Sequence, residues 1–257
     1  MAETTESPAP PAPMVALREV WKSFDRKAVL HGLSLELRKG TTLAIMGGSG
    51  TGKTVTLRLA VGLMPPDAGE IWLLGTRIDR MREEQMLPLR RRTGFVFQGA
   101  ALFDSLTVFE NVAYGLREHT RVGEGEIADR VHRFLSLVGM SGTDDLMPAE
   151  LSGGMRKRVG IARALVLEPE MLFFDEPTAG LDPTNARLVA ELIAQLRAGV
   201  CDTAMIVTHD IEFAEMVADR MAILHQGTFA GEGTPEEIRR STDPAVQKFL
   251  AGELREG

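Results

Sequence analysis

The chain has 257 residues, of which 44% are hydrophobic and 25% are charged, so it is long and apolar enough to bury a sizeable core. Its formal net charge of −7 argues against a broad nucleic-acid-binding surface, which requires clustered lysine and arginine side chains to neutralise phosphates. Because Cys201 is the single cysteine, an intrachain disulfide and a thiolate metal cluster are both excluded.

The N-terminal segment 1–13, MAETTESPAPPAP, predicts a disordered and partly polyproline II tail. It has acidic residues where a signal peptide is basic, and it lacks an apolar segment. The chain contains no run of about 18 apolar residues, so we expect it not to cross a membrane by itself. Any association with a membrane is therefore expected to come through a partner.

Strand patterns come next along the chain. Alternating apolar residues at 14–21 and 32–40 predict two strands of an antiparallel flap. The nearly continuous apolar segment 41–46 is typical of a central parallel strand that is covered on both faces. A helix is expected over 55–63, and Pro65 terminates it.

The pattern between residues 99 and 167 is helical and has no strand signal, which predicts an inserted helical subdomain. Strands return at 171–177, 204–210 and 220–227, separated by helical segments. Strands that alternate with helices of this length predict a mostly parallel α/β sheet.

A glycine-rich loop, GGSGTGKT, matches the pattern G-x-x-x-x-G-K-[ST] and lies between a buried strand and a helix. The glycines let the backbone approach phosphates, and the helix N-terminus adds a positive dipole end. Lys53 would reach the β and γ phosphates, and Thr54 would offer its hydroxyl to Mg²⁺. A glycine-rich turn with a chance lysine is the less favoured interpretation. The predicted nucleotide contacts are Gly47, Gly48, Ser49, Gly50, Thr51, Gly52, Lys53, Thr54 and Val55.

A P-loop alone does not distinguish a GTPase, a small-molecule kinase and a motor ATPase, but the two acidic residues in LFFDEP do. A hydrophobic strand delivers Asp175 at its end, where the carboxylate can hold Mg²⁺, and Glu176 follows as a candidate to orient or deprotonate water. Two acids that merely begin a turn are the alternative. His209 ends the apolar strand MIVTHD, at the same sheet edge, and is expected to contact the γ phosphate. Gln98, after GFVF, is expected to report Mg²⁺ or attacking water to the helical subdomain, unless it is only a polar hinge.

A second candidate anion site lies far from the first, in LSGGMRKRVGIARAL. The turn Ser152–Gly154 stands directly before a helix, so it offers a hydroxyl, backbone amides and a dipole end. The basic run 156–158 is interpreted as the solvated, ion-paired face of that helix rather than as a lipid-headgroup patch. Two phosphate sites in one chain require either two ligands or a second copy of the chain.

Together these motifs, with AGLD at 179–182, resemble the ATP-binding subunits of ABC transporters over about residues 15–240. The resemblance implies that Phe24 stacks on adenine, although from the sequence alone it is equally a core or flap residue. It also implies that two copies close head to tail, with Ser152, Gly153 and Gly154 contributing to the ATP site of the partner, and that Asp182 takes part in nucleotide binding. Expected catalytic residues are Glu176, His209, Lys53 and Gln98, and expected Mg²⁺ ligands are Thr54, Gln98 and Asp175.

Two departures from the usual ABC ATPase motifs indicate one branch of the family. Val55 replaces a second hydroxyl residue after the P-loop, and Met155 with the basic run replaces a glutamine-rich continuation. Both features, with the C-terminal STDPAVQKFLAGEL, look like the Mla-type, Mkl-like ATPases, which energise phospholipid movement between the membranes of Gram-negative bacteria. This resemblance implies a homodimer on the cytoplasmic face of the inner membrane, held there by a permease and accompanied by a substrate-binding subunit of MCE type.

The expected fold is therefore an ABC-type P-loop NTPase, a mostly parallel sheet flanked by helices, with an antiparallel β flap and an inserted α-helical subdomain. The expected divisions are a tail at 1–13, core parts at 14–98 and 168–240, the helical signature subdomain at 99–167 and a C-terminal helical extension at 241–257. The extension predicts a helix capped by Ser241 or Asp243. Its apolar face docks either on a neighbouring subunit or on its own domain.

Alternative functions stay open at this point. They are an importer ATPase for a small polar solute, a soluble ABC ATPase acting on DNA or the ribosome, and a non-hydrolysing regulator. DNA-repair members carry long coiled coils and translation factors usually carry two ATPase domains, and the sequence has neither feature. The segment 101–109, ALFDSLTVF, is the candidate contact with the permease.

Overall fold

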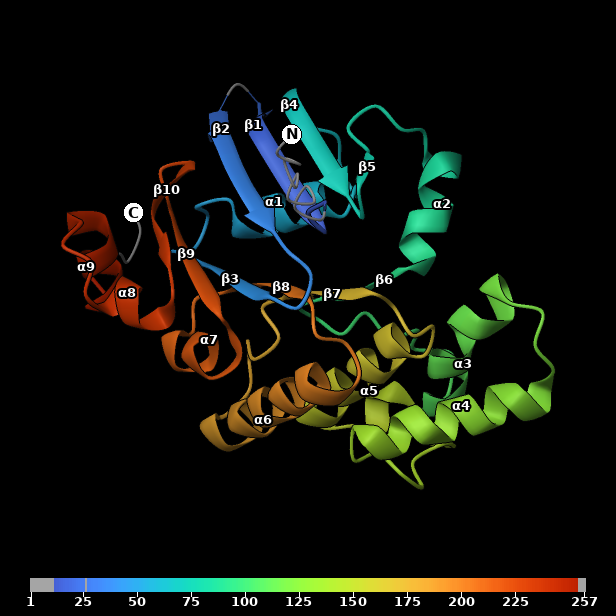
Figure 1. Cartoon of the computed structure of the whole chain (residues 1–257). Helices are drawn as coiled ribbons and strands as arrows, with labels where there is room; N and C mark the ends of the chain where they lie inside the picture. The colour runs from blue at the N-terminus through green and yellow to red at the C-terminus, as the bar shows by residue number, and fades with distance from the viewer. Residues whose placement is uncertain (1–11, 26, 254–257) are drawn as a thin grey trace, which may run out of the picture.

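The computed structural model describes residues 12–25 and 27–253. Within these ranges the chain forms two sheets, with helices on both faces of the larger one (Figure 1). Most of the predicted tail, residues 1–11, lies outside the described residues, as do the last four residues of the predicted extension. No helix in the described part is both long and apolar enough to cross a bilayer.

The larger sheet has the strand order β10-β9-β3-β8-β7-β6 in the described chain. Its strands are β3 (Thr42–Met46), β6 (Thr93–Val96), β7 (Met171–Asp175), β8 (Ala204–Thr208), β9 (Arg220–His225) and β10 (Thr228–Gly233). All neighbours from β9 to β6 pair in parallel, and β10 returns antiparallel to β9. Every residue of β3, β7 and β8 is buried, which explains their continuous apolar sequences.

The smaller sheet is the expected antiparallel flap, with strand order β2-β1-β4-β5. It contains β1 (Val15–Phe24) and β2 (Lys27–Leu37), and also β4 (Ala68–Leu73) and β5 (Thr76–Arg77), which the sequence patterns did not predict. Helix α1 (Lys53–Ala60) lies between the two sheets, and α2 (Glu83–Arg91) follows the flap (Figure 1). The expected helix over 55–63 was too long, because Gly62 takes a φ of +73° after α1 has ended.

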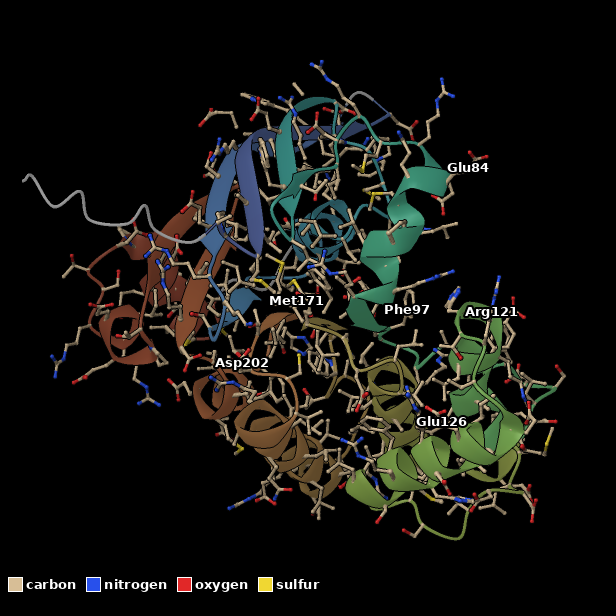
Figure 2. All side chains as sticks on the ribbon, turned by 45° about the vertical axis from the view of Figure 1, so that its right-hand side comes forward. Glu84, Phe97, Arg121, Glu126, Met171 and Asp202 are labelled. Carbon is tan, nitrogen blue, oxygen red and sulfur yellow. The ribbon has the colours of Figure 1, made fainter. Side chains whose placement is uncertain are left out.

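The remaining helices are α3 (Val108–His119), α4 (Glu124–Leu137), α5 (Gly153–Leu165), α6 (Pro183–Gly199), α7 (Ile211–Val217), α8 (Pro235–Arg239) and α9 (Pro244–Leu250), with a 3₁₀ turn at Pro148–Glu150. Helices α3, α4 and α5 pack on one another and form a lobe at the lower right of Figure 1. Figure 2 labels Arg121 and Glu126 on this lobe, and Phe97 where the chain leaves the core for it.

The C-terminal helix α9 packs on its own domain. Asp243 caps the helix by accepting hydrogen bonds from the amides of Ala245 and Val246. Val246 and Phe249 are buried in one apolar cluster with residues of β3 and β9. The described structure therefore uses the apolar face of this helix inside the subunit.

Strand alternation places α1 and α5 on opposite faces of the larger sheet. Along β7, Phe173 belongs to the apolar cluster that contains α1, whereas Leu172 and Phe174 belong to the cluster that contains α5 and α6. The two glycine-rich turns that start α1 and α5 are consequently built on different sides of the sheet.

Candidate functional site

The P-loop is fitted tightly against the strands beside it. A Cβ atom on Gly47 would lie 2.4 Å from the carbonyl oxygen of Leu224 in β9, and one on Gly52 would lie 2.9 Å from Val29 in β2. Both contacts are too short for any side chain, and Gly52 also has a φ of +106°. Glycine at these positions is therefore required by the packing of the loop.

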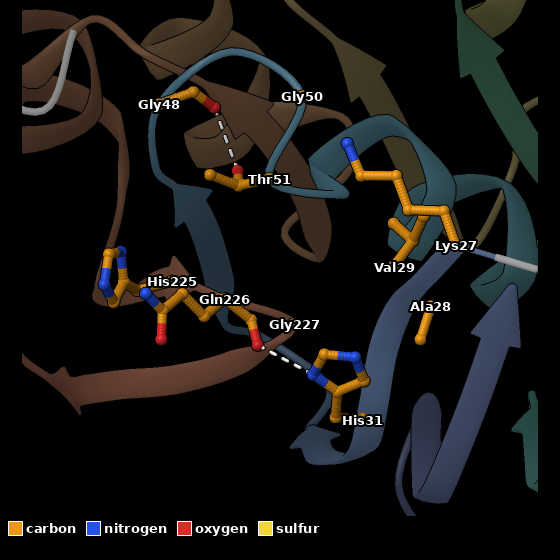
Figure 3. A pocket seen from close by; sticks show the side chains of 10 residues that line it. All are labelled: Lys27, Ala28, Val29, His31, Gly48, Gly50, Thr51, His225, Gln226 and Gly227. Atoms are coloured by element: carbon orange, nitrogen blue, oxygen red, sulfur yellow. Dashed lines mark hydrogen bonds between the residues drawn. The ribbon is translucent and has the colours of Figure 1, made fainter. Parts of the chain in front are cut away.

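The predicted nucleotide contacts from Gly47 to Val55 form the loop and the first turn of α1. The Nζ atom of Lys53 donates to the carbonyl oxygens of Gly47 at 2.9 Å and Gly48 at 2.8 Å, so the ammonium group lies inside the curve of the loop. The hydroxyl of Thr51 donates to the Gly48 carbonyl at 2.9 Å, as Figure 3 shows. The loop thus holds a buried positive charge next to the uncapped start of a helix.

Thr54 and Asp175 meet at the edge of the sheet. The hydroxyl of Thr54 donates to Oδ1 of Asp175 at 2.8 Å, which joins α1 to the end of β7. A hydroxyl and a single carboxylate are hard oxygen ligands of the kind that Mg²⁺ accepts when substrate phosphates complete its shell. The described residues contain no group of three or more acidic, histidine or cysteine side chains that would hold a metal alone. This donor pair therefore fits a Mg²⁺ ion bound together with phosphate.

Glu176 stands between two candidate cations. One carboxylate oxygen lies 3.7 Å from Nζ of Lys53, and the other lies 2.9 Å from Nδ1 of His209 and 3.3 Å from the His209 amide that donates to it. Its backbone amide donates to the carbonyl of Val207 in β8, and its φ is +46°, a strained value for a residue with a side chain. The strand order β3-β8-β7 brings the P-loop, His209 and both acids to one edge, as the sequence predicted.

Gln98 is linked to Glu176 by Lys157, a residue that the sequence analysis did not assign to the site. Nζ of Lys157 in α5 donates to the backbone carbonyls of Gln98 and Glu176, the latter at 3.1 Å. Lys157 is only 6% exposed, so interpreting 156–158 as a solvated, ion-paired face is wrong for its central residue. Arg156 and Arg158 also bond to backbone carbonyls, at Leu151 and at Val138 and Gly139.

The second glycine turn uses its own side chain as a cap. Ser152 accepts a hydrogen bond from the amide of Met155, and Gly154 packs so closely on Asn185 that a Cβ atom would lie 2.9 Å from its side-chain oxygen. Asp182 caps α6 and also accepts a hydrogen bond from the side chain of Asn185 at 2.6 Å. Ser152 to Gly154 and Asp182 therefore form one contact between α5 and α6, and their expected part in nucleotide binding stays a prediction.

A cavity of about 490 Å³ opens beside the P-loop (Figure 3). It is bounded by Gly48, Gly50 and Thr51 of the loop, by Lys27, Ala28, Val29 and His31 of β2, by His225 at the end of β9, and by Gln226 and Gly227 of the turn that follows. Phe24 does not line it; this side chain is 42% exposed at the end of β1, with Nζ of Lys22 at 5.5 Å from its ring centre. Adenine stacking on Phe24 stays a prediction.

Comparisons with known proteins agree with this geometry. The family model described as ABC transporter matches residues 30–179. The intermembrane phospholipid transport system ATP-binding protein MlaF of Escherichia coli is 38% identical over 241 residues, 94% of this chain and 90% of that protein. A protein of Mycobacterium leprae named probable ribonucleotide transport ATP-binding protein mkl is 38% identical over 238 residues, 93% of this chain and 69% of its own length.

A solved structure gives the same result for the fold. The ATP-binding cassette MJ0796, in a dimeric post-hydrolysis state with ADP and phosphate, superposes with a TM-score of 0.80 at 30% identity, covering 86% of this chain and 99% of that one. The P-loop, the strand-end acids and the mostly parallel sheet have the arrangement expected from the resemblance. The chain belongs to the ABC transporter family and is one of its ATP-hydrolysing, nucleotide-binding subunits.

Proposed function

We propose that the chain powers phospholipid transport, as two copies bound beneath a separate permease on the cytoplasmic face of the inner membrane. The observation that carries the substrate class is the similarity to MlaF over nearly the full length of both proteins. The mycobacterial relative, named as a probable ribonucleotide transport protein, favours the second candidate, an importer for a small polar solute.

The proposed chemistry is in-line attack of water on the γ phosphorus of ATP. Lys53 and the loop amides bind the phosphates, Glu176 accepts the proton of the attacking water, and ADP leaves with its bridging oxygen. His209 holds the Glu176 carboxylate and faces the charge that develops on the γ phosphate. The contact of Glu176 with both Lys53 and His209 supports these roles, because it joins base and phosphate site in one cluster.

Thr54, Asp175 and Gln98 are the proposed Mg²⁺ ligands. The ion would neutralise phosphate charge and orient the β and γ oxygens. The 2.8 Å contact between the Thr54 hydroxyl and the Asp175 carboxylate supports the proposal, because it brings two hard oxygen donors together.

The turn Ser152–Gly154 is proposed to bind the γ phosphate of a second copy. Helices α1 and α5 lie on opposite faces of the larger sheet, so one chain does not surround a single triphosphate with both turns. The MJ0796 cassette to which the chain is similar forms a dimer. A two-fold dimer would complete two equal sites from two incomplete ones.

The contact with the permease is proposed to lie on the helical lobe. Phe103 and Tyr114 are each 43% exposed, with ring centres 4.8 Å apart, and the guanidinium of Arg163 lies 5.9 Å from the Phe103 ring. Exposed aromatic and arginine side chains are enriched at protein interfaces. A substrate-binding subunit of MCE type is the further partner that the Mla-type resemblance implies.

The test of the substrate class is purification of the chain with its membrane subunit, followed by mass spectrometry of bound lipid and ATPase assays in bilayers. We expect copurified phospholipid, and hydrolysis that depends on the phospholipid composition of the bilayer. A complex without bound lipid whose hydrolysis responds to a ribonucleotide would contradict the lipid proposal and favour the second candidate.

A further inference from the structure

Lys157 is a buried cation with an unusual set of partners. It lies one helical turn beyond Gly153, the first residue of α5, and its side chain points into the interior, with 6% exposed. Its ammonium group donates to the backbone carbonyls of Gln98, at the entry to the helical lobe, and of Glu176. One side chain therefore bridges two loops of the site from a helix on the opposite face of the sheet from α1.

This burial opposes stability. Desolvation lowers the pKa of the Lys157 ammonium, although the charges of Glu176 and Asp175 act in the other direction. Its hydrogen bonds go to neutral carbonyl oxygens, which compensate an ammonium group less well than a paired carboxylate does. A methionine would fill the same space without that desolvation cost, so packing alone does not explain a lysine here.

The neighbouring cations of α5 provide the contrast. Arg158 reaches the carbonyls of Val138 and Gly139 at the end of α4, within the helical lobe and away from the sheet edge. Arg156 is exposed and reaches Leu151, directly before its own helix. Of these three side chains, Lys157 alone contacts residues with a proposed part in hydrolysis.

The contact with the Glu176 carbonyl matters most, because Glu176 is the proposed catalytic base. Its carboxylate contacts Lys53 and His209, and its amide donates to Val207. Lys157 adds a charged donor to the Glu176 carbonyl, which also accepts a hydrogen bond from the amide of Ala179 at 3.2 Å. These contacts support a residue whose φ of +46° is otherwise unfavourable. A small rotation of this peptide would move the carboxylate relative to the phosphate site.

We propose that Lys157 is a positioning residue that holds the backbone of Glu176 and Gln98 of its own chain, and so ties the catalytic base to the signature helix α5. The inference rests on the proposed role of Glu176 as the base. If α5 moves when Ser152–Gly154 binds the nucleotide of a second copy, Lys157 would transmit that movement to the backbone of Glu176.

The experiment compares the full-length Lys157→Met, Lys157→Arg and Arg158→Met variants in steady-state ATP hydrolysis, nucleotide binding and thermal unfolding. In Lys157→Met we expect kcat to fall on the order of 10²-fold, the cost of misplacing a catalytic group by about 1 Å. KM and the Kd for ATP should stay within about twofold, because phosphate binding does not use Lys157. The melting temperature should stay equal or rise, because a buried charge is removed.

The controls separate positioning from a general effect on α5. Lys157→Arg keeps a charged donor and should recover most of kcat, and Arg158→Met should keep it. A Lys157→Met protein with wild-type kcat would overturn the inference, and so would an equal loss in Arg158→Met. If Lys157→Met does not fold, Lys157→Leu takes its place under the same criteria.

Mixed dimers locate the effect. In a dimer of one Ser152→Arg chain and one Lys53→Ala chain, a single site is intact. It combines the P-loop and Glu176 of the Ser152→Arg chain with the Ser152–Gly154 turn of the Lys53→Ala chain. Adding Lys157→Met to the Ser152→Arg chain should remove the activity of the mixture, whereas adding it to the Lys53→Ala chain should not. The reverse pattern would overturn positioning within the chain. An inactive mixture of the two parent variants would contradict the proposed dimer instead, and the homodimer kinetics above would still test Lys157.

Discussion

Helices α1 and α5 both begin at glycine-rich turns, but the two turns differ in the charged groups that surround them. The start of α1 has no side-chain cap, and the Lys53 ammonium, Asp175 and Glu176 lie around it, delivered by neighbouring parts of the same chain. The start of α5 is capped by its own Ser152 and packs on Asn185 of α6. The first turn has a buried cation and two carboxylates beside it, whereas the second has only amides and a hydroxyl to offer.

The largest expected effect comes from disabling each turn separately. Ser152→Arg and Lys53→Ala should each abolish hydrolysis, the first by blocking the signature turn and the second by removing the phosphate-binding cation. An equal mixture of the two inactive chains should regain about a quarter of wild-type turnover, because half of the dimers are mixed and each mixed dimer has one intact site. The measurement is phosphate release after mixing.

ATP binding gives the control for this comparison. Ser152→Arg should still bind a fluorescent ATP analogue, because its P-loop is intact, whereas Lys53→Ala should not. A mixture that stays inactive, although both variants are folded, would mean that each chain completes its own site and that the second turn has no role in hydrolysis.

The next effect belongs to the first turn alone. Glu176→Gln should lower kcat on the order of 10²-fold or more, because the amide does not accept the proton of the attacking water. The amide keeps the volume of the side chain, so KM for ATP should change little. Steady-state hydrolysis at saturating ATP measures the loss. Turnover close to wild type in the folded variant would remove Glu176 from the role of base.

The first turn was also the part of the site that the sequence predicted well. A P-loop after a buried strand, with Asp175 and His209 ending two further buried strands, fixes three groups at one sheet edge, because parallel strands end together. Strand alternation and local motifs contain this information. No contact between distant segments had to be known beyond the order of the strands.

Lys157 was missed for a physical reason. Charged side chains in a basic run are usually solvated, so the run 156–158 was assigned as a whole to the solvent-facing side of its helix. In the structure the buried face also includes Gly154, Lys157 and Gly160, and Gly160 packs 3.2 Å from Ala100 when given a Cβ atom. Small residues spaced three apart around Lys157 were the available signal. Its acceptors lie 59 and 19 residues away, which periodicity within one helix does not reveal.

A smaller effect tests the metal pair of the first turn. Thr54→Val removes the hydroxyl that donates to Asp175 and should raise the Mg²⁺ concentration needed for half-maximal hydrolysis roughly tenfold, a typical cost of losing a ligand-orienting group. Thr56→Val is the matched control, because Thr56 lies in the same helix and its hydroxyl donates to the carbonyl of Gly52 instead. Titration of hydrolysis with MgCl₂ measures both. Equal shifts in the two variants would count against Thr54 as a ligand.

The smallest effect concerns the adenine ring of the nucleotide, which is expected to bind on the side of the first turn and not of the second. Phe24→Ala should raise KM for ATP roughly fivefold, because stacking of a base on an aromatic ring contributes about 1 kcal/mol at an exposed site. The ring has one face near the Lys22 ammonium and is 42% exposed, so it is accessible to a second flat group. Since stacking touches neither the water nor the γ phosphate, kcat should stay unchanged.

Trp21→Ala supplies the matched control for Phe24, because it removes an aromatic ring of similar exposure, 46%, from the same strand. The comparison of KM for ATP with KM for GTP sharpens the result, since any flat base stacks and the ratio should change less than either value. If Phe24→Ala leaves KM unchanged while Trp21→Ala raises it, the aromatic contact belongs to another part of β1. The proposed phosphate and metal contacts of the first turn would be unaffected, and adenine would lie beside Trp21 instead of Phe24.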